Sequence, residues 1–218
     1  MAAQLKNKRL PDGIFLTHGH IGHYTGLMFL GRESLSAESL PVYGMPRMRT
    51  FLKNNGPWDQ LLALNNIELR SLSKDSTMVL NSRLSVTPIE VPHRDEYTET
   101  VGYLIQNSAS KALFIPDIDK WHKWDRSIVQ LVKEVDIALL DATFFKAGEI
   151  QRDMNEVPHP FVEESMALFD SLDGKHRAKI YFTHFNHTNP LLNEQSEAQR
   201  ELKVKGYNSA QQEMIISF

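Results

Sequence analysis

The stretch Thr17-His18-Gly19-His20-Ile21-Gly22-His23 decides the fold. It places three histidines within six residues, directly after the short apolar run 13–16. The two glycines allow tight backbone turns, so the three rings can converge without clashes between Cβ atoms. Neutral imidazole is a common ligand of zinc, iron and other first-row metals. The stretch predicts a metal-binding loop between a strand and a helix; the alternative is a polar loop whose histidines hydrogen-bond the backbone.

The same kind of residue recurs where other predicted strands end. Five predicted strands terminate in a histidine or an aspartate, namely His18, His93, Asp117, Asp141 and His184. In α/β sheets, groups just past the strand ends face a shared crevice. Packing alone does not explain five polar ends at one edge. We therefore expect these side chains to meet in one site.

Strand and helix signals alternate along the chain, which predicts an α/β fold with helices covering sheets. Strands are expected over 13–17, 41–44, 83–91, 100–106, 111–115, 137–140 and 179–183, with a hairpin turn at 107–110. Helices are expected over 24–33, 46–54, 124–135, 161–172 and 194–204. Nothing repeats and no low-complexity linker divides the chain, so one domain over residues 1–218 is expected.

Composition excludes several classes of protein. The 218 residues include no cysteine, so disulfides and thiolate zinc sites are impossible. The formal charge is -3 and no long Lys/Arg run occurs, so no nucleic-acid partner is expected. The start MAAQLKNKRL lacks the apolar segment of a signal peptide, and no apolar stretch approaches the roughly 20 residues that span a bilayer. We expect a cytoplasmic protein with a small-molecule substrate and no membrane partner, and leave a homodimer open.

The histidine stretch resembles the His-x-His-x-Asp-His signature of the metallo-β-lactamase superfamily, with Gly22 in place of the aspartate. Two further segments resemble ribonuclease Z-like phosphodiesterases, Leu139-Leu140-Asp141-Ala142-Thr143-Phe144 and Pro158-His159-Pro160. The spacing, including Asn186-His187-Thr188-Asn189-Pro190, is also similar to the pyrroloquinoline-quinone biosynthesis protein B group, which we take as the nearest neighbour. The resemblance implies a metallo-β-lactamase-like αββα sandwich.

The resemblance also implies a set of metal ligands. In chain order they are His18, His20, His23, His93, Asp117 and His184. The first ion would take His18, His20 and His93. The second would take His23 and His184, with Asp117 between the two ions. Asp119 lies two residues from Asp117 and competes with it, but is better suited to cap a following helix near Lys120.

Asp141, His159 and His187 are the predicted catalytic residues. By resemblance, an acidic residue and a histidine beside the metals handle protons, which suits Asp141 and His159 as a general acid/base pair. Their alternative is a pair of caps at a strand end and a helix start. His187 would reach the substrate or transfer a proton.

Two departures from the family pattern matter. Gly22 removes a carboxylate that normally helps to hold the second metal, so we expect zinc with one tight ion and a second that is weak or absent; manganese or iron also suits these ligands. Only about sixteen residues precede the histidine stretch, where family members have several strands. Either the chain is truncated or the first sheet is reduced.

These features predict a metal-dependent hydrolase that uses a metal-activated water on a small-molecule ester, phosphodiester or lactone-type substrate. A His-rich site with a carboxylate and open positions also suits non-haem iron chemistry with dioxygen, which is the alternative of an oxygenase related to quinone cofactor biosynthesis. A degenerate scaffold that only binds a metal or ligand is the third possibility.

Overall fold

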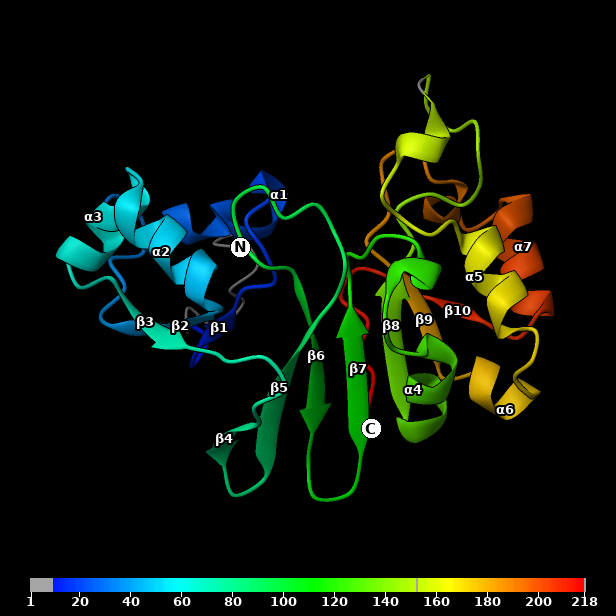
Figure 1. Ribbon diagram of the computed structural model, residues 1–218, viewed down its shortest axis with the longest axis horizontal. Coiled ribbons are helices and arrows are strands. Elements are labelled where there is room, and N and C mark those ends of the chain that lie inside the picture. The colour runs from blue at the N-terminus through cyan, green and yellow to red at the C-terminus, as the bar shows by residue number, and fades with distance from the viewer. Residues whose placement is uncertain (1–9, 152, 218) are drawn as a thin grey trace. The chain divides into compact units, whose positions relative to one another are not determined.

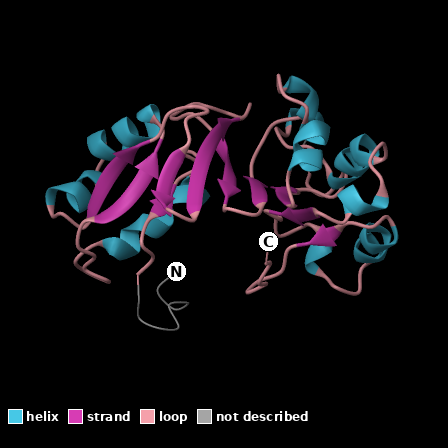
Figure 2. Cartoon of the chain, turned by 90° about the horizontal axis from the view of Figure 1, so that it is seen from below, coloured by secondary structure: helices cyan, strands magenta, loops and turns pink. Residues whose placement is uncertain are grey.

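The computed structural model describes residues 10–151 and 153–217 (Figure 1). Contacts divide the chain into an N-terminal unit, Met1–Ser76 with Asp95–Val101, and a C-terminal unit, Thr77–Arg94 with Gly102–Phe218. Each unit has its own sheet with helices beside it (Figure 2). The expected α/β class is confirmed, whereas a single domain over 1–218 stays a prediction.

The described part of the N-terminal unit holds a three-stranded parallel sheet. Its strands, in spatial order, are β1 (Ile14–Phe15), β2 (Leu40–Gly44) and β3 (Ile67–Ser71). Its helices are α1 (Ile21–Tyr24), the 3₁₀ helix η2 (Thr25–Leu30), α2 (Pro46–Asn54) and α3 (Trp58–Ala63). Pro46 opens α2 as predicted, because its fixed φ suits the first helical position. Met48 and Leu52 bury one face of that helix.

The described part of the C-terminal unit forms a seven-stranded sheet in the order β10-β9-β8-β7-β6-β5-β4. The strands are β4 (Met78–Asn81), β5 (Leu84–Glu90), β6 (Val101–Gln106), β7 (Lys111–Ile115), β8 (Ile137–Asp141), β9 (Ile180–Thr183) and β10 (Asn208–Ser209). Strands β7 to β10 run parallel, whereas β6 and β7 are antiparallel. The predicted hairpin between them is confirmed. Asn107 closes its turn, since its Oδ1 accepts from the N–H groups of Ala109 and Ser110.

Helices beside this sheet pack through one continuous apolar core, namely η3 (Trp121–Lys123), α4 (Ile128–Glu134), α5 (Val162–Phe169), η5 (Pro190–Leu192) and α7 (Glu197–Val204). The short η4 (Met154–Glu156) packs through Met154 in a separate cluster with Phe144 and Val157, and α6 (Gly174–Arg177) buries none of its residues. Val132, Phe169 and Leu202 come from helices, while Leu140 and Phe182 come from strands, and all are fully buried. This core holds the sheet edge that carries the polar residues.

Two predicted helices are wrong in part. Within 24–33, α1 ends at Tyr24, and the chain continues as η2. Leu27 and Leu30 are buried there, and a spacing of three residues aligns side chains in a 3₁₀ helix as well as in an α-helix. Within 124–135, Trp124 is extended and α4 begins only after Ser127, whose side chain caps the N–H of Gln130.

The polar strand ends lie where predicted in the C-terminal unit. Asp117 comes two residues after β7, Asp141 is the last residue of β8, and His184 directly follows β9. Because these three strands are parallel neighbours, their carboxyl ends share one edge. His184 has φ 64°, a left-handed conformation that costs a non-glycine residue free energy and clusters at functional sites.

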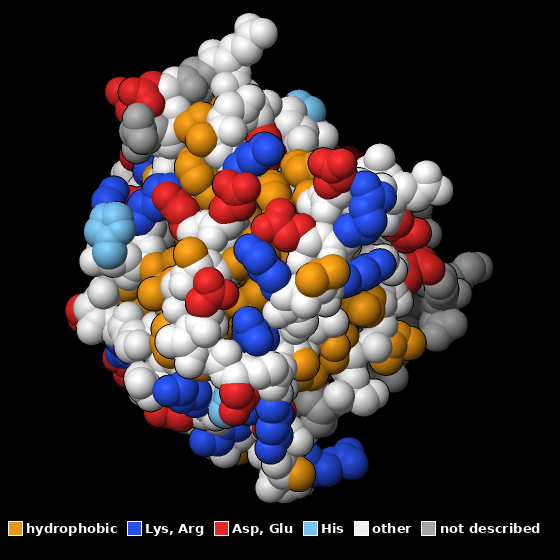
Figure 3. Space-filling view, turned by 90° about the vertical axis from the view of Figure 1, so that its right-hand side faces the viewer, with side chains coloured by type: hydrophobic (Ala, Val, Ile, Leu, Met, Phe, Trp, Pro, Cys, Tyr) orange, Lys and Arg blue, Asp and Glu red, His pale blue; other side chains and the backbone are white. Residues whose placement is uncertain are grey.

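Surface features add two observations. Among the described residues, no helix combines the length and apolar character that crossing a membrane requires. On the face seen in Figure 3, basic and acidic side chains are interspersed. That face therefore carries no continuous basic track of the kind that binds a phosphate backbone.

Candidate metal centre

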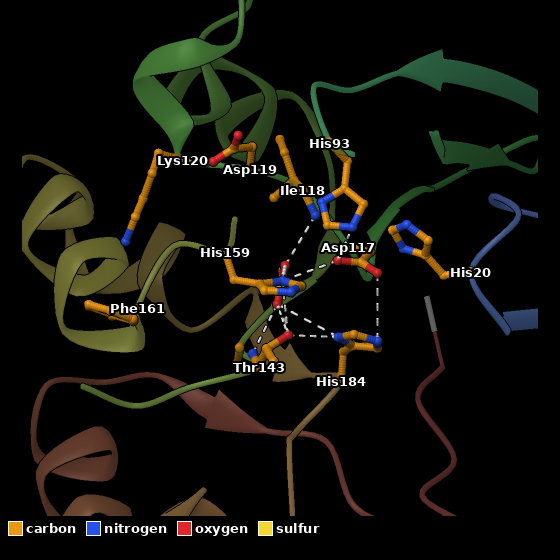
Figure 4. A network of polar contacts seen from close by, with 12 residues as sticks. His20, His93, Asp117, Ile118, Asp119, Lys120, Thr143, His159, Phe161 and His184 are labelled. Carbon is orange, nitrogen blue, oxygen red and sulfur yellow. Dashed lines mark hydrogen bonds and ion pairs between the residues drawn. The ribbon is translucent and has the colours of Figure 1, made fainter. Parts of the chain in front are cut away.

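Four side chains of the C-terminal unit converge on one point (Figure 4). Asp117, Asp141, His159 and His184 each offer one ligand atom, and these atoms all lie within 4.8 Å of one another. His93, from the segment after β5, adds its Nε2 at 3.3 Å from Asp117 Oδ1. Five predicted site residues therefore meet, although they come from separate segments spread over more than ninety positions of sequence.

Asp141 organises this cluster. It is fully buried. Its Oδ2 accepts from Ile118 N at 3.1 Å and from His159 Nδ1 at 2.8 Å. Its Oδ1 accepts from Thr143 N at 2.9 Å and from the Thr143 hydroxyl at 2.7 Å. Because both oxygens already accept two hydrogen bonds, Asp141 is suited to position its neighbours rather than to bind a cation.

Asp117 faces the histidines. Its Oδ1 lies 3.1 Å from His159 Nδ1, and its Oδ2 lies 3.9 Å from His184 Nε2. Asp119, the competitor, accepts instead from Lys120 N at 2.7 Å and from Lys123 Nζ at 2.8 Å. This geometry supports Asp117 as the site carboxylate and leaves Asp119 in the adjoining turn.

The cluster attracts positive charge. Burial would raise the pKa of Asp141, but the charge of His159, the hydrogen bond from His159 and the nearby His184 ring hold that pKa below its ordinary value. Burial would lower the pKa of His159, but the carboxylates of Asp141 and Asp117 raise it to about 10. The pKa of His184 is raised because the carboxylate of Asp141, whose Oδ1 lies 3.8 Å from His184 Nδ1, and the charge of Asp117 outweigh the effect of burial. The paired carboxylates thus favour a bound proton or a metal cation at the same place.

In the N-terminal unit, the three histidines of the loop at 17–23 lie together. His18 Nε2 is 2.9 Å from His20 Nδ1, and the ring centroids of His18 and His23 are 4.2 Å apart. His20 Nε2 also lies 3.2 Å from Glu96 Oε2. Glu96 was missed from the sequence; the only available signal was its place in the acidic segment that follows His93.

The two glycines of this loop have different roles. A Cβ on Gly19 would lie 2.7 Å from Thr98 Cγ2, and Gly19 N donates to Thr98 Oγ1 at 2.7 Å. Gly19 therefore permits a close backbone approach. Gly22 sits in α1 with nothing within 4 Å of a Cβ and with no left-handed φ. A side chain at position 22 fits without strain.

The structure does not test how the remaining predicted residues would share metal ions or contact a substrate. His18 and His20 belong to the N-terminal unit and His93 to the C-terminal unit, and their sharing of one ion stays a prediction. The same holds for a second ion on His23, His184 and Asp117. His187 lies in the turn after β9 with an exposed side chain, and its substrate role also stays a prediction.

The donor set of the C-terminal cluster fits a divalent metal. It combines imidazole nitrogens with carboxylate oxygens, which suits zinc, manganese and iron, and it contains no thiolate. Asp117 and the Nε2 of His184 are the groups best disposed to bind such an ion. His159 instead places its Nδ1 in contact with one carboxylate oxygen of Asp117 and one of Asp141.

Comparison with known proteins identifies the class. Residues 2–185 match the beta-lactamase superfamily domain, and the chain belongs to this family. Over 227 residues it is 25% identical to coenzyme PQQ synthesis protein B of Methylobacillus flagellatus, covering 94% of this chain and 72% of the relative. The resemblance predicted from the sequence is confirmed: the chain is a metallo-β-lactamase superfamily member near PqqB.

Solved structures agree on the fold. Zinc-bound PqqB from Methylobacterium extorquens superposes with a TM-score of 0.76 and 20% identity, over 94% of this chain and 73% of that one. A diphosphatase from the PhnP family superposes with a TM-score of 0.63 and 22% identity, over 100% of this chain and 75% of that one. Both likenesses concern the fold alone.

Proposed function

We propose that this protein is a metal-dependent hydrolase acting on a small-molecule ester, phosphodiester or lactone-type substrate. One observation carries the proposal, the convergence of two carboxylates and two histidines whose ligand atoms lie within 4.8 Å, where Asp117 and His184 would hold a metal and Asp141 and His159 would handle a proton beside it. The diphosphatase with the same fold supports it by analogy. Zinc is the cofactor that we propose, because a zinc-bound relative shares the fold.

A bound divalent ion supplies Lewis acidity and lowers the pKa of water from about 15.7 to near 7. The side chains supply binding and proton transfer. Asp117 and His184 would hold the ion. His159 carries a proton between two carboxylates through Nδ1, which leaves Nε2 on the far side of the ring to exchange a proton with the leaving group. Asp141 orients His159 and stabilises its protonated form.

The test is hydrolysis by the full chain, purified without chelators and analysed for metal content. We would assay bis(p-nitrophenyl) phosphate, p-nitrophenyl acetate and a homoserine lactone. At least one should be hydrolysed, with activity lost to a chelator and restored by zinc. Asp117→Asn should abolish that activity, while the exposed His122→Ala should not. No hydrolysis by zinc-, manganese- or iron-loaded protein would overturn the proposal.

The relatives favour a second candidate. Their name, coenzyme PQQ synthesis protein B, suggests a role in making a quinone cofactor, which could use non-haem iron and dioxygen. Metal content separates the two. Iron retained through purification, together with oxygen uptake, would favour an oxygenase. A chain that binds metal yet turns over no substrate in either assay would be a binding scaffold.

A further inference from the structure

The hydroxyl of Thr143 touches three members of the metal centre. Its Oγ1 lies 2.7 Å from Asp141 Oδ1, 2.8 Å from His184 Nδ1 and 3.1 Å from His159 Nδ1. Thr143 is itself buried, with 8% of its surface exposed. A hydroxyl has one proton to donate and two lone pairs that accept. Only one of the three groups can accept the hydroxyl proton. The other two must then donate a hydrogen to the hydroxyl oxygen if they are to form a hydrogen bond with it.

Asp141 must receive that proton. An ionised carboxylate only accepts hydrogen bonds, and Asp141 Oδ1 already accepts from Thr143 N. If the hydroxyl pointed its proton at His184, two oxygen lone pairs would face each other across 2.7 Å. With the proton on the Asp141 side, the hydroxyl can only accept from the imidazoles. His184 must then carry a hydrogen on Nδ1.

We propose that Thr143 is a positioning residue, which relays the charge of Asp141 to His184, fixes a hydrogen on Nδ1 and so presents Nε2 to the metal. This inference rests on the proposed function only in taking His184 as a metal ligand. Nε2 is the nitrogen that faces Asp117, at 3.9 Å from its Oδ2. Metal-binding histidines ordinarily gain their orientation from a group on the other ring nitrogen, and here a hydroxyl fills that place.

The backbone holds Thr143 in place for this role. Its carbonyl oxygen accepts from Asn186 N at 3.0 Å and from Asn189 Nδ2 at 3.2 Å. Asn189 is buried and also donates to Ala142 O at 2.7 Å. The turn that begins at His184 is thus tied to the segment that carries the hydroxyl. This anchoring accompanies the left-handed backbone of His184.

The test compares hydroxyl-free and hydroxyl-bearing variants of the full chain loaded with zinc. Thr143→Val removes the hydroxyl at nearly constant volume, Thr143→Ala is a second hydroxyl-free variant, and Thr143→Ser restores it. Thr87→Val is the control, because Thr87 lies in β5 of the same sheet and its hydroxyl contacts the hydroxyl of Thr77 at 2.8 Å. Long-range ¹H–¹⁵N NMR correlations of the histidine rings report which nitrogen of His184 binds zinc, without any assay of activity.

We expect wild type, Thr143→Ser and Thr87→Val to show zinc on Nε2 and a hydrogen on Nδ1 of His184. Thr143→Val or Thr143→Ala should show mixed coordination or none, with zinc affinity at this site about 10- to 100-fold weaker. Uniform Nε2 coordination in the hydroxyl-free variants would overturn the role of Thr143 alone. A wild-type His184 ring that does not respond to zinc would overturn the metal-site assignment and this inference together.

Discussion

His159 Nδ1 lies 2.8 Å from Asp141 Oδ2 and 3.1 Å from Asp117 Oδ1, so one imidazole nitrogen bridges two buried carboxylates. Asp141 and His159, the predicted general acid/base pair, are therefore in direct contact. The carboxylates favour a proton on this ring, and general acid/base catalysis needs such a proton at a defined place. The two carboxylates have different roles. Both oxygens of Asp141 already accept hydrogen bonds, so Asp141 positions its neighbours, whereas Asp117 faces the histidines.

His159→Ala should lower turnover by about 10²- to 10⁴-fold while leaving the metal content unchanged, because it removes a proton carrier. Metal analysis of the purified variant beside steady-state kinetics checks this. His122→Ala, at an exposed position of the same unit, is the control and should match wild type. Loss of metal together with activity would show that His159 is a ligand instead.

Gly22→Asp should strengthen a weak second phase of zinc binding. Position 22 has open space and no left-handed φ, so the aspartate can be accommodated, and it restores the carboxylate of the family pattern. Zinc titration of the wild type should show one tight and one weak phase. Gly174→Asp, which also adds a carboxylate in open space, should leave both phases unchanged. Two tight, dialysis-resistant equivalents in the unmodified protein would contradict this prediction.

Stability of the metal-free protein should fall as the pH rises from about 6.5 to about 10. The folded pKa of His159, about 10, exceeds the ordinary value of 6.5, so the folded state binds that proton more tightly. The contribution of protonated His159 to the free energy of unfolding is fully present below pH 6.5 and is lost as the pH approaches 10. Thermal unfolding of wild type and His159→Gln across this window isolates the effect from other titrating groups. An identical slope in the two proteins would exclude His159 as its source.

Lys120→Met should loosen the segment that carries His159. Lys120 Nζ lies 2.7 Å from Glu164 Oε2 and 3.8 Å from the centroid of the Phe161 ring. The same Glu164 oxygen accepts from Phe161 N at 2.8 Å. This contact joins the loop after β7 to the start of α5.

The variant should lose about 1 kcal/mol of unfolding free energy in denaturant titrations, since a cation–π contact and an ion pair are removed. Turnover should fall with it. Lys123→Met breaks the ion pair of a more exposed lysine with Asp119 and should cost less, with turnover unchanged. Equal effects of the two substitutions would show that the Lys120 contact has no special influence on the site.

Much of the site was predictable because the end of a strand can be recognised from the few residues around it in the sequence. Apolar runs end at Asp117, Asp141 and His184, and parallel neighbours must bring such ends to one edge. Helix boundaries were less predictable: the spacing of Leu27 and Leu30 suits two kinds of helix, and only the backbone at Tyr24 decides between them.

The sequence by itself determined which residue types could bind a metal, and that Gly22 stands where the family has a carboxylate. Only the tertiary structure decided what each group does. Thr143 was visible two residues after Asp141, yet its role depends on His159 and His184, which are 16 and 41 positions away in the chain. The helix or strand propensity of a short segment carries no information about contacts between residues so far apart in the sequence. A hydroxyl, a carboxylate and two imidazoles acquire their protonation states only when folding sets the distances between them, because hydrogen bonds act over about 3 Å.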